Sequence, residues 1–261
     1  MVTALTIAGS DSGGGAGIQA DLKTFAAHRV YGTSAITAVT AQNTVGVRAW
    51  QALPPDLVTA QIEAVVTDIG ADAVKIGMLA TAGIVRAVAQ AVRALSLPHV
   101  VLDPVMVAKG GDRLLEADAV AALRSELLPL AEIVTPNIPE AEVLARMAIR
   151  TLDDRHAAAR VIHALGPRVV LVKGGHADGA ESIDVALLPT GPLEIRGPRI
   201  ESRNTHGTGC TLSSAIAAHL ARGTGQDVAL RAAREYLEGA IRHAPRLGSG
   251  HGPLAHFWRL Y

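Results

Sequence analysis

Val169-Val170-Leu171-Val172 is an uninterrupted apolar run that ends at Lys173, and Val100-Val101-Leu102 is a second such run that ends at Asp103. Strands of a parallel sheet have continuous runs of this kind, because helices cover both of their faces. In such a sheet, ligands bind at the carboxyl ends of the strands. Lys173 and Asp103 are therefore predicted to lie at the ligand-binding edge of a sheet.

Shorter apolar or β-branched segments alternate with helical patterns around these two runs. This alternation is typical of βαβ units, so the chain is predicted to form an α/β fold of three layers, α/β/α, around a mostly parallel central sheet. Further strands are expected at residues 5–8, 34–40, 73–76 and 133–135, and the clearest helices at residues 81–95 and 153–165.

The pattern changes after Lys173. Two shorter runs, residues 183–188 and 193–195, flank Pro189-Thr190-Gly191-Pro192, which predicts a short antiparallel hairpin at the edge of the sheet. No internal repeat and no long linker interrupts the 261 residues. We therefore expect a single domain over residues 1–261.

The composition is that of an ordinary soluble enzyme. The 24 basic and 24 acidic residues give a formal net charge of zero, which favours neither nucleic acid nor an anionic membrane as a partner. No apolar run approaches the roughly 18 residues of a membrane span, and the first residues do not form a signal sequence. The lone Cys210 excludes an internal disulfide and fits a reducing compartment, so we expect a cytoplasmic protein.

A glycine-containing segment, Asn204-Thr205-His206-Gly207-Thr208-Gly209-Cys210-Thr211, precedes the apolar run from Leu212 to Leu220. The glycines let backbone N–H groups turn inward, and the following helix adds the positive end of its dipole, so this segment is predicted to hold an anion. The segment has no Walker lysine, which suggests phosphoryl transfer by an enzyme without a P-loop. The alternative is that Gly207-Thr208-Gly209 is only a tight turn.

A second glycine-rich segment, Gly13-Gly14-Gly15-Ala16-Gly17, follows the first predicted strand. A dinucleotide-binding loop would need the G-x-G-x-x-G spacing and an acidic residue about 20 positions further on. The spacing is different here, and Thr40-Ala41-Gln42-Asn43 occupies the place of the acidic residue. A nucleotide-dependent oxidoreductase is therefore disfavoured.

Five motifs occur in order along the chain, and together they resemble the hydroxymethylpyrimidine/phosphomethylpyrimidine kinases of thiamine biosynthesis, which belong to the ribokinase-like superfamily. The resemblance extends from about residue 5 to residue 220, and the residues after 220 carry no motif. The motifs are Ala8-Gly9-Ser10-Asp11-Ser12-Gly13-Gly14-Gly15-Ala16-Gly17-Ile18-Gln19-Ala20-Asp21, Asp103-Pro104-Val105-Met106-Val107-Ala108-Lys109-Gly110-Gly111, Thr135-Pro136-Asn137-Ile138-Pro139-Glu140-Ala141-Glu142, Val172-Lys173-Gly174-Gly175-His176 and the segment around Cys210.

The resemblance implies an ATP- and Mg²⁺-dependent kinase. Its expected substrate is a small aminopyrimidine, 4-amino-5-hydroxymethyl-2-methylpyrimidine, which is phosphorylated to the monophosphate and then to the diphosphate. Gln42 is implied to recognise the pyrimidine, since a carboxamide offers donors and an acceptor to its mixed edge. Asp21, Gly9, Met78 and Val105 are the other implied substrate contacts. Without the resemblance, the favoured interpretation of Gln42 is a solvated loop amide, and that of Asp21 is an ordinary acid in the first turn of a helix.

The implied cofactor-binding residues are Lys173, Asn137 and Thr208. Asn137 and Glu140 have the N-x-x-E spacing with which ribokinase-like enzymes organise magnesium and phosphates, and Asp103 is a second candidate to face the metal. The alternative for Asn137 and Glu140 is a helix start, with a cap followed by an acid in the first turn. Lys109, next to two glycines, is expected on a flap that closes over the site.

Cys210 is where the chain departs from the sugar kinases of the same superfamily. Their corresponding signature, G-A-G-D, ends in the aspartate that acts as base, whereas this chain has Gly207-Thr208-Gly209-Cys210. We expect Cys210 to assist deprotonation of the alcohol and the N–H groups of Gly207 to Cys210 to stabilise the transferred phosphoryl group. A neutral thiol would also tolerate the charged monoester in the second step better than a carboxylate would.

Other functions remain open at this point. Pyridoxal kinase is the nearest alternative, because relatives with the same signature phosphorylate that vitamin. A sensor that binds a pyrimidine or nucleotide without turnover is a second alternative, although Asn137, Glu140 and Cys210 are all present. Homodimers are common among such relatives, so a homodimer is a possible assembly.

Overall fold

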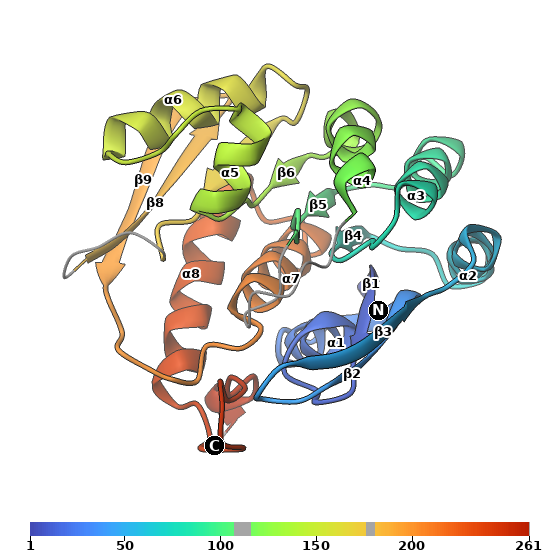
Figure 1. Cartoon of the computed structure of the whole chain (residues 1–261), viewed down its shortest axis with the longest axis horizontal. Helices are drawn as coiled ribbons and strands as arrows, with labels where there is room; N and C mark the ends of the chain where they lie inside the picture. Colours follow the sequence, from blue (N-terminus) through green and yellow to red (C-terminus); the bar gives the residue numbers. More distant parts are fainter. Residues whose placement is uncertain (107–115, 176–180, 261) are drawn as a thin grey trace.

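Nine strands form one sheet in the part of the chain that the computed structural model describes, which is residues 1–106, 116–175 and 181–260. Their order across the sheet is β3-β2-β1-β4-β5-β6-β7-β8-β9 (Figure 1). The strands are β1 (Thr3–Asp11), β2 (Tyr31–Gln42), β3 (Val47–Ala52), β4 (Ala73–Ile76), β5 (Val100–Leu102), β6 (Ile133–Val134), β7 (Val169–Val172), β8 (Glu181–Leu188) and β9 (Gly191–Pro198).

The centre of the sheet is parallel, as predicted. β1 pairs in parallel with β2 and β4, and parallel pairing continues through β5, β6 and β7. Every residue of β4, β5 and β7 is buried. These strands are covered on both faces, which explains their continuous apolar sequences and the single exception, Lys75 in β4.

Both edges of the sheet are antiparallel. β8 and β9 form the predicted hairpin, and β8 pairs with β7. At the opposite edge β3 pairs with β2, and the sequence pattern does not predict this strand. Most residues of β3 are exposed, so it lacks the alternation of apolar and polar residues that marks a half-buried strand.

Helices cover the sheet on both faces and confirm the three-layer arrangement (Figure 1). One face packs against α1 (Gly17–Ala27), α7 (Thr208–Ala221) and α8 (Gln226–Arg242). The other packs against α2 (Pro55–Asp68), α3 (Ala82–Ala94), α4 (Ala117–Ala122), α5 (Ile138–Ala145) and α6 (Leu152–His163). Short helical turns occupy Leu123–Leu127, Leu128–Leu130 and Trp258–Leu260.

The start of each predicted helix has a chemical cause. The Thr81 side chain accepts a hydrogen bond from the Ile84 amide at the start of α3, and Thr151 and Asp154 form a capping box at the start of α6. α7 is buried almost throughout, which explains its apolar run. Among the helices of the described ranges, none combines the length and apolar character that crossing a membrane requires.

β1 is the point at which the chain changes direction across the sheet. It lies between β2 and β4. After β1, the strands β2 and β3 are added on one side of it, and the strands from β4 to β9 are added on its other side. The loops that leave the carboxyl ends of strands at such a switch point diverge and form a crevice. The glycine-rich segment between β1 and α1 opens into this crevice.

The residues beyond α8, which carry no motif, fold back onto the loop before α7. The His206 amide donates a hydrogen bond to the Gly252 carbonyl oxygen at 3.2 Å. The His251 amide donates to the Thr44 carbonyl oxygen, between β2 and β3, at 2.8 Å. The C-terminal segment thus ties the loop before α7 to the β2–β3 turn.

Candidate active site

A cavity of about 830 Å³ lies at the carboxyl ends of the parallel strands. Among the described residues, it brings together all but one of those that the sequence analysis selects for the site. Those that line it are Gly9, Gln42, Met78, Asp103, Val105, Asn137, Glu140, Lys173, Gly207, Thr208, Gly209 and Cys210. Asp21 does not line it, and Lys109 lies outside the described residues.

The start of α7 closes tightly against the glycine-rich loop. Gly207 caps the helix with a φ of 82°, a left-handed conformation that favours glycine. A Cβ atom at this position would collide with the carbonyl oxygen of Gly15. The residues from Gly207 to Cys210 line the cavity, on a backbone that requires glycine at position 207. A helix start that lines a cavity is what an anion site needs.

Replacing Gly207 with alanine should cost about 1–3 kcal/mol of unfolding free energy from the left-handed backbone, and more from the collision with Gly15. Gly223 is a matched control, because its φ is 77° but no atom lies within 4 Å of the place that a Cβ would occupy. Gly223→Ala should show the backbone cost alone. Equal losses for the two variants in urea unfolding would contradict the close packing assigned to Gly207.

Gly209, the second residue of α7, lets the helix approach an ion pair. The Lys173 ammonium lies 2.8 Å from Oδ1 of Asp103, and the pair is mostly buried. A Cβ on Gly209 would lie 3.1 Å from Asp103 Oδ2 and 3.3 Å from Lys173 Nζ. Burial lowers the pKa of Lys173, but the Asp103 and Glu140 carboxylates outweigh this effect and raise it, so Lys173 is a cation.

Asn137 and Glu140 form a capping box at the start of α5. The Glu140 amide donates to Oδ1 of Asn137 at 2.9 Å, and the Asn137 amide donates to Oε2 of Glu140 at 2.8 Å. The helix-start interpretation is therefore correct, and both side chains also line the cavity. Burial raises the pKa of Glu140 to about 7; Lys173 opposes this rise and Asp103 adds to it.

The carboxylates of Asp103 and Glu140 fit a magnesium ion that is held mainly by other ligands. Burial and the Asp103 carboxylate both raise the Glu140 pKa, and a magnesium ion held near these two carboxylates would favour their ionised forms. Within the described ranges, no three His, Cys, Asp or Glu side chains converge to form a complete metal site. Magnesium suits such a site, because it retains waters and takes phosphate oxygens as ligands.

Cys210 is the third residue of α7 and lines the cavity at the same helix end. Burial raises the pKa of its thiol to about 11, although the nearby Lys75 ammonium favours the thiolate. The thiol is therefore neutral near pH 7. This is the state that the sequence analysis expects of a residue beside a charged monoester.

Asp21 lies below the cavity floor and is fully buried. Its carboxylate accepts hydrogen bonds from Lys75 Nζ at 2.8 Å, Ser214 Oγ at 2.7 Å and Thr6 Oγ1 at 2.6 Å. All of these partners belong to the protein, and Asp21 is shielded from the cavity. We therefore assign Asp21 to positioning Lys75, in place of the substrate contact that the resemblance implies.

Lys75 is a site residue that the sequence analysis did not select. It lines the cavity from β4, and its side chain is fully buried. Burial lowers its pKa, but the Asp21 carboxylate outweighs this and holds the pKa above its ordinary range. A lysine within the otherwise apolar strand Ala73–Ile76 was the available signal, because a buried lysine needs a partner.

An apolar part of the cavity lies near the ends of β1 and β2. Met78 packs with Ala38, Ala80 and Val105, and its Sδ atom would lie 3.0 Å from a Cβ on Gly9. Because Gly9 has no side chain, Met78 can pack closely against the backbone of β1 there. Gln42, at the end of β2, lines the cavity beside this apolar part.

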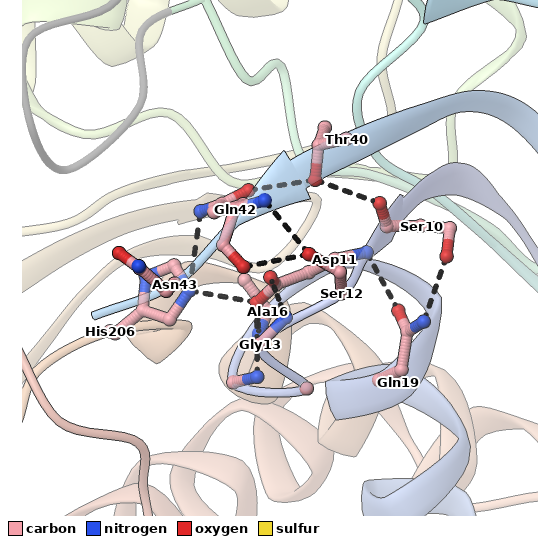
Figure 2. A network of polar contacts seen from close by, with 12 residues as sticks. Ser10, Asp11, Ser12, Gly13, Ala16, Gln19, Thr40, Gln42, Asn43 and His206 are labelled. Carbon is pink, nitrogen blue, oxygen red and sulfur yellow. Dashed lines mark hydrogen bonds and ion pairs between the residues drawn. The ribbon is translucent and has the colours of Figure 1, made fainter. Parts of the chain in front are cut away.

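A polar network surrounds Gln42 and joins the loops after β1 and before α7 (Figure 2). The Asp11 carboxylate accepts hydrogen bonds from the amides of Gly13, Gly15 and Ala16, and from His206 Nε2 at 2.8 Å. Burial opposes ionisation of Asp11, but the hydrogen bonds from His206 and the loop amides outweigh it and lower its pKa. Neither Asp11 nor His206 was selected from sequence, because their 195-residue separation conceals the contact.

The opposite half of the sheet contributes a second part of the cavity. β8 and β9 lie on the other side of the sheet order from β2, and α8 lies beside them (Figure 1). Apolar side chains from this half, Pro198, Ile200, Leu212, Leu237 and Ile241, line the cavity. Leu212, Leu237 and Ile241 lie in helices, where apolar side chains are also what an ordinary core requires, so they did not stand out in the sequence.

Comparison with known proteins gives one consistent result. The phosphomethylpyrimidine kinase family model matches residues 11–255. The hydroxymethylpyrimidine/phosphomethylpyrimidine kinase of Rhizobium meliloti is 52% identical over 261 residues, covering 99% of this chain and 98% of that protein. The thiamine biosynthesis bifunctional protein ThiED of Geobacter sulfurreducens is 50% identical over 252 residues, but the chain spans only 51% of its length.

The solved structures agree with the ribokinase-like fold. An ADP complex of Bacillus subtilis pyridoxal kinase superposes with a TM-score of 0.93 at 40% identity, covering 100% of both chains. The family match spans the glycine-rich loop, the Asp103–Lys173 pair, the Asn137–Glu140 capping box and the start of α7. By sequence and by fold, the chain belongs to the phosphomethylpyrimidine kinase family.

Proposed function

We propose that this chain transfers the γ-phosphoryl group of ATP to the alcohol of 4-amino-5-hydroxymethyl-2-methylpyrimidine, and then phosphorylates the resulting monophosphate to the diphosphate. The observation that carries the proposal is the position of the α7 start. The residues from Gly207 to Cys210 line a cavity that has an apolar part near Gln42 and a cationic part at Lys173. A ring alcohol in the first part and a triphosphate in the second would meet at α7.

Different residues of the cavity bind different parts of the two substrates. Met78 and Val105 contact the faces of the ring, and Gln42 pairs with its polar edge. Lys173 and the α7 amides bind the phosphates, and the apolar residues beside α8 accept the base of the nucleotide. Mg²⁺ held near Glu140 and Asp103 would neutralise phosphate charge during transfer.

Cys210 is proposed to take the proton from the attacking alcohol. The base is the thiolate form of Cys210, which is a minor fraction near pH 7, and it becomes the neutral thiol when it takes the proton. Phosphoryl transfer through a loose transition state requires this proton removal only late. Lys75 and the positive end of α7 stabilise the small thiolate fraction. The second phosphorylation needs no base, because the attacking phosphate oxygen is already ionised.

Product analysis tests the proposal directly. The protein is incubated with ATP, Mg²⁺ and the aminopyrimidine, and the products are identified by mass spectrometry. Formation of ADP with the pyrimidine mono- and diphosphates is expected. Binding of the pyrimidine without ADP formation would instead indicate a sensor.

Pyridoxal is the necessary competitor in this assay, because the Bacillus subtilis structure with the same fold is a pyridoxal kinase. The two substrates require the same transfer chemistry and differ in the ring that the Gln42 end accepts. We expect a higher kcat/KM for the aminopyrimidine. A higher value for pyridoxal would reverse the assignment.

The Mg²⁺ requirement should depend on pH through Glu140. Its pKa of about 7 means that protons compete with the metal below pH 7, so the Mg²⁺ concentration for half-maximal rate should be about tenfold higher at pH 6 than at pH 8. Glu140→Gln can keep the capping box but cannot ionise. It should need more Mg²⁺ and lose the pH dependence, and an unchanged dependence would assign the titration to another group.

A further inference from the structure

The hydrogen bonds around Gln42 determine which way its carboxamide faces. Gln42 Nε2 lies 3.3 Å from His206 Nε2, and its Oε1 lies 3.1 Å from Thr40 Oγ1 (Figure 2). The oxygen and nitrogen of an amide have nearly the same shape, so their partners must decide between the two orientations. Each of these partners is itself held by a further group of known hydrogen-bonding character.

His206 Nε2 carries a proton. It lies 2.8 Å from Oδ2 of Asp11, whose carboxylate also accepts three backbone N–H groups and is therefore ionised. A carboxylate only accepts, so the shared proton belongs to His206. With the Gln42 nitrogen on this side, two donors would face each other.

The contacts of Thr40, on the other side of the Gln42 amide, support the same orientation. Its hydroxyl lies 3.0 Å from the Ser10 carbonyl oxygen, which can only accept. The hydroxyl proton is therefore used by Ser10, and Thr40 Oγ1 is left as an acceptor for an amide N–H. A rotation of the Gln42 amide by about 180° satisfies all of these groups, since its oxygen then faces His206 and its nitrogen faces Thr40.

We propose that His206 and Thr40 are specificity-determining positioning residues, which fix the Gln42 amide in this rotated orientation. The far edge of the amide then presents one N–H and one carbonyl lone pair in a fixed order to the cavity. An aminopyrimidine offers a ring nitrogen that accepts and an amino group that donates, and this order matches the amide in only one direction. The inference rests on the proposed pyrimidine substrate and names the residues that give Gln42 its selectivity for that substrate.

The 4-oxo analogue, 5-hydroxymethyl-2-methyl-4-oxopyrimidine, is the discriminating probe. Its ring N–H and carbonyl oxygen reverse the order of donor and acceptor, while its shape and its alcohol are unchanged. To pair with it, the Gln42 amide must turn and place its nitrogen against the His206 donor. The wild-type protein should therefore phosphorylate the amino compound with much the higher kcat/KM.

The test compares both pyrimidines in wild type and four variants. Thr40→Val and His206→Leu release one side of the amide, so the preference for the amino compound should fall about tenfold or more, chiefly through KM. Thr40→Ser keeps the hydroxyl and His206→Gln keeps a donor, so both should retain most of the preference. Thermal unfolding identifies any variant that has lost its fold. If His206→Leu does not fold, the result for Thr40→Val alone tests the inference.

Two results would overturn the inference. If Thr40→Val and His206→Leu lower kcat/KM for both pyrimidines by the same factor, the network only supports the fold. If the preference is unchanged in both, the amide is oriented by other groups. Failure of the wild-type protein to phosphorylate either pyrimidine is a different result, because it overturns the proposed function itself.

Discussion

Cys210→Ala should lower kcat for phosphorylation of the alcohol by about 10²-fold, the scale of a lost general base, and leave KM within a few-fold. The thiol lines the cavity at the start of α7, whereas the proposed contacts to the ring, Met78, Val105 and Gln42, lie on other elements. Because its pKa of about 11 lies above the assay range, the wild-type rate of the chemical step should rise with pH between 7 and 9. The alanine variant should lose that rise. Wild-type turnover by Cys210→Ala would show that the thiol only fills space.

The two phosphorylations separate the role of Cys210 as base from a general defect. Cys210→Ala should slow monophosphate formation far more than diphosphate formation, since only the alcohol must lose a proton. Cys210→Asp should do the reverse, because a carboxylate can act as base but repels the monoester dianion. Both steps use the same α7 amides and the same nucleotide. Equal losses in both steps for both variants would contradict the idea that cysteine is present to tolerate a charged substrate.

Lys75→Met should destabilise the protein by about 3–5 kcal/mol, because it leaves the Asp21 carboxylate buried without its cation. Both side chains of this pair are 0% exposed, so solvent cannot replace the lost ammonium. Urea unfolding of the full chain measures the change. The alcohol step should also slow, because Lys75 is the nearby cation that favours the Cys210 thiolate.

Two further variants separate the pairing of Lys75 from its bulk. Arg86→Met breaks an ion pair with Glu126 whose side chains are 59% and 34% exposed, and it should change stability by no more than about 0.5 kcal/mol. The double variant Asp21→Asn with Lys75→Met removes both buried charges and should be at least about 2 kcal/mol more stable than Lys75→Met alone. A Lys75→Met protein within about 1 kcal/mol of wild type would show that Asp21 is satisfied by Thr6 and Ser214.

The strands that are buried on both faces of the sheet were predictable from the sequence, and so was the edge hairpin. β4 and β5 have the predicted bounds, and the β8–β9 hairpin lies at the predicted edge. The apolar sequences of β4 and β5 follow from helices on both faces, so they carry the information locally. The hairpin was marked instead by the proline- and glycine-containing turn between its two strands. β3 was not predictable in this way, because an exposed edge strand is held by its pairing with β2 and has no apolar face of its own to reveal it.

The sequence by itself determined the α/β class, the family motifs and most of the residues that line the cavity, because short segments with fixed spacing encode turns, helix starts and strand ends. Only the tertiary structure decided that Asp21 lies beneath the cavity and pairs with Lys75, which lines it, and that Asp11 meets His206 beside Gln42. These contacts join residues 54 and 195 positions apart. A buried charge needs a partner, but no local pattern names it, since the partner is fixed only when the strand order brings distant loops to the same edge of the sheet.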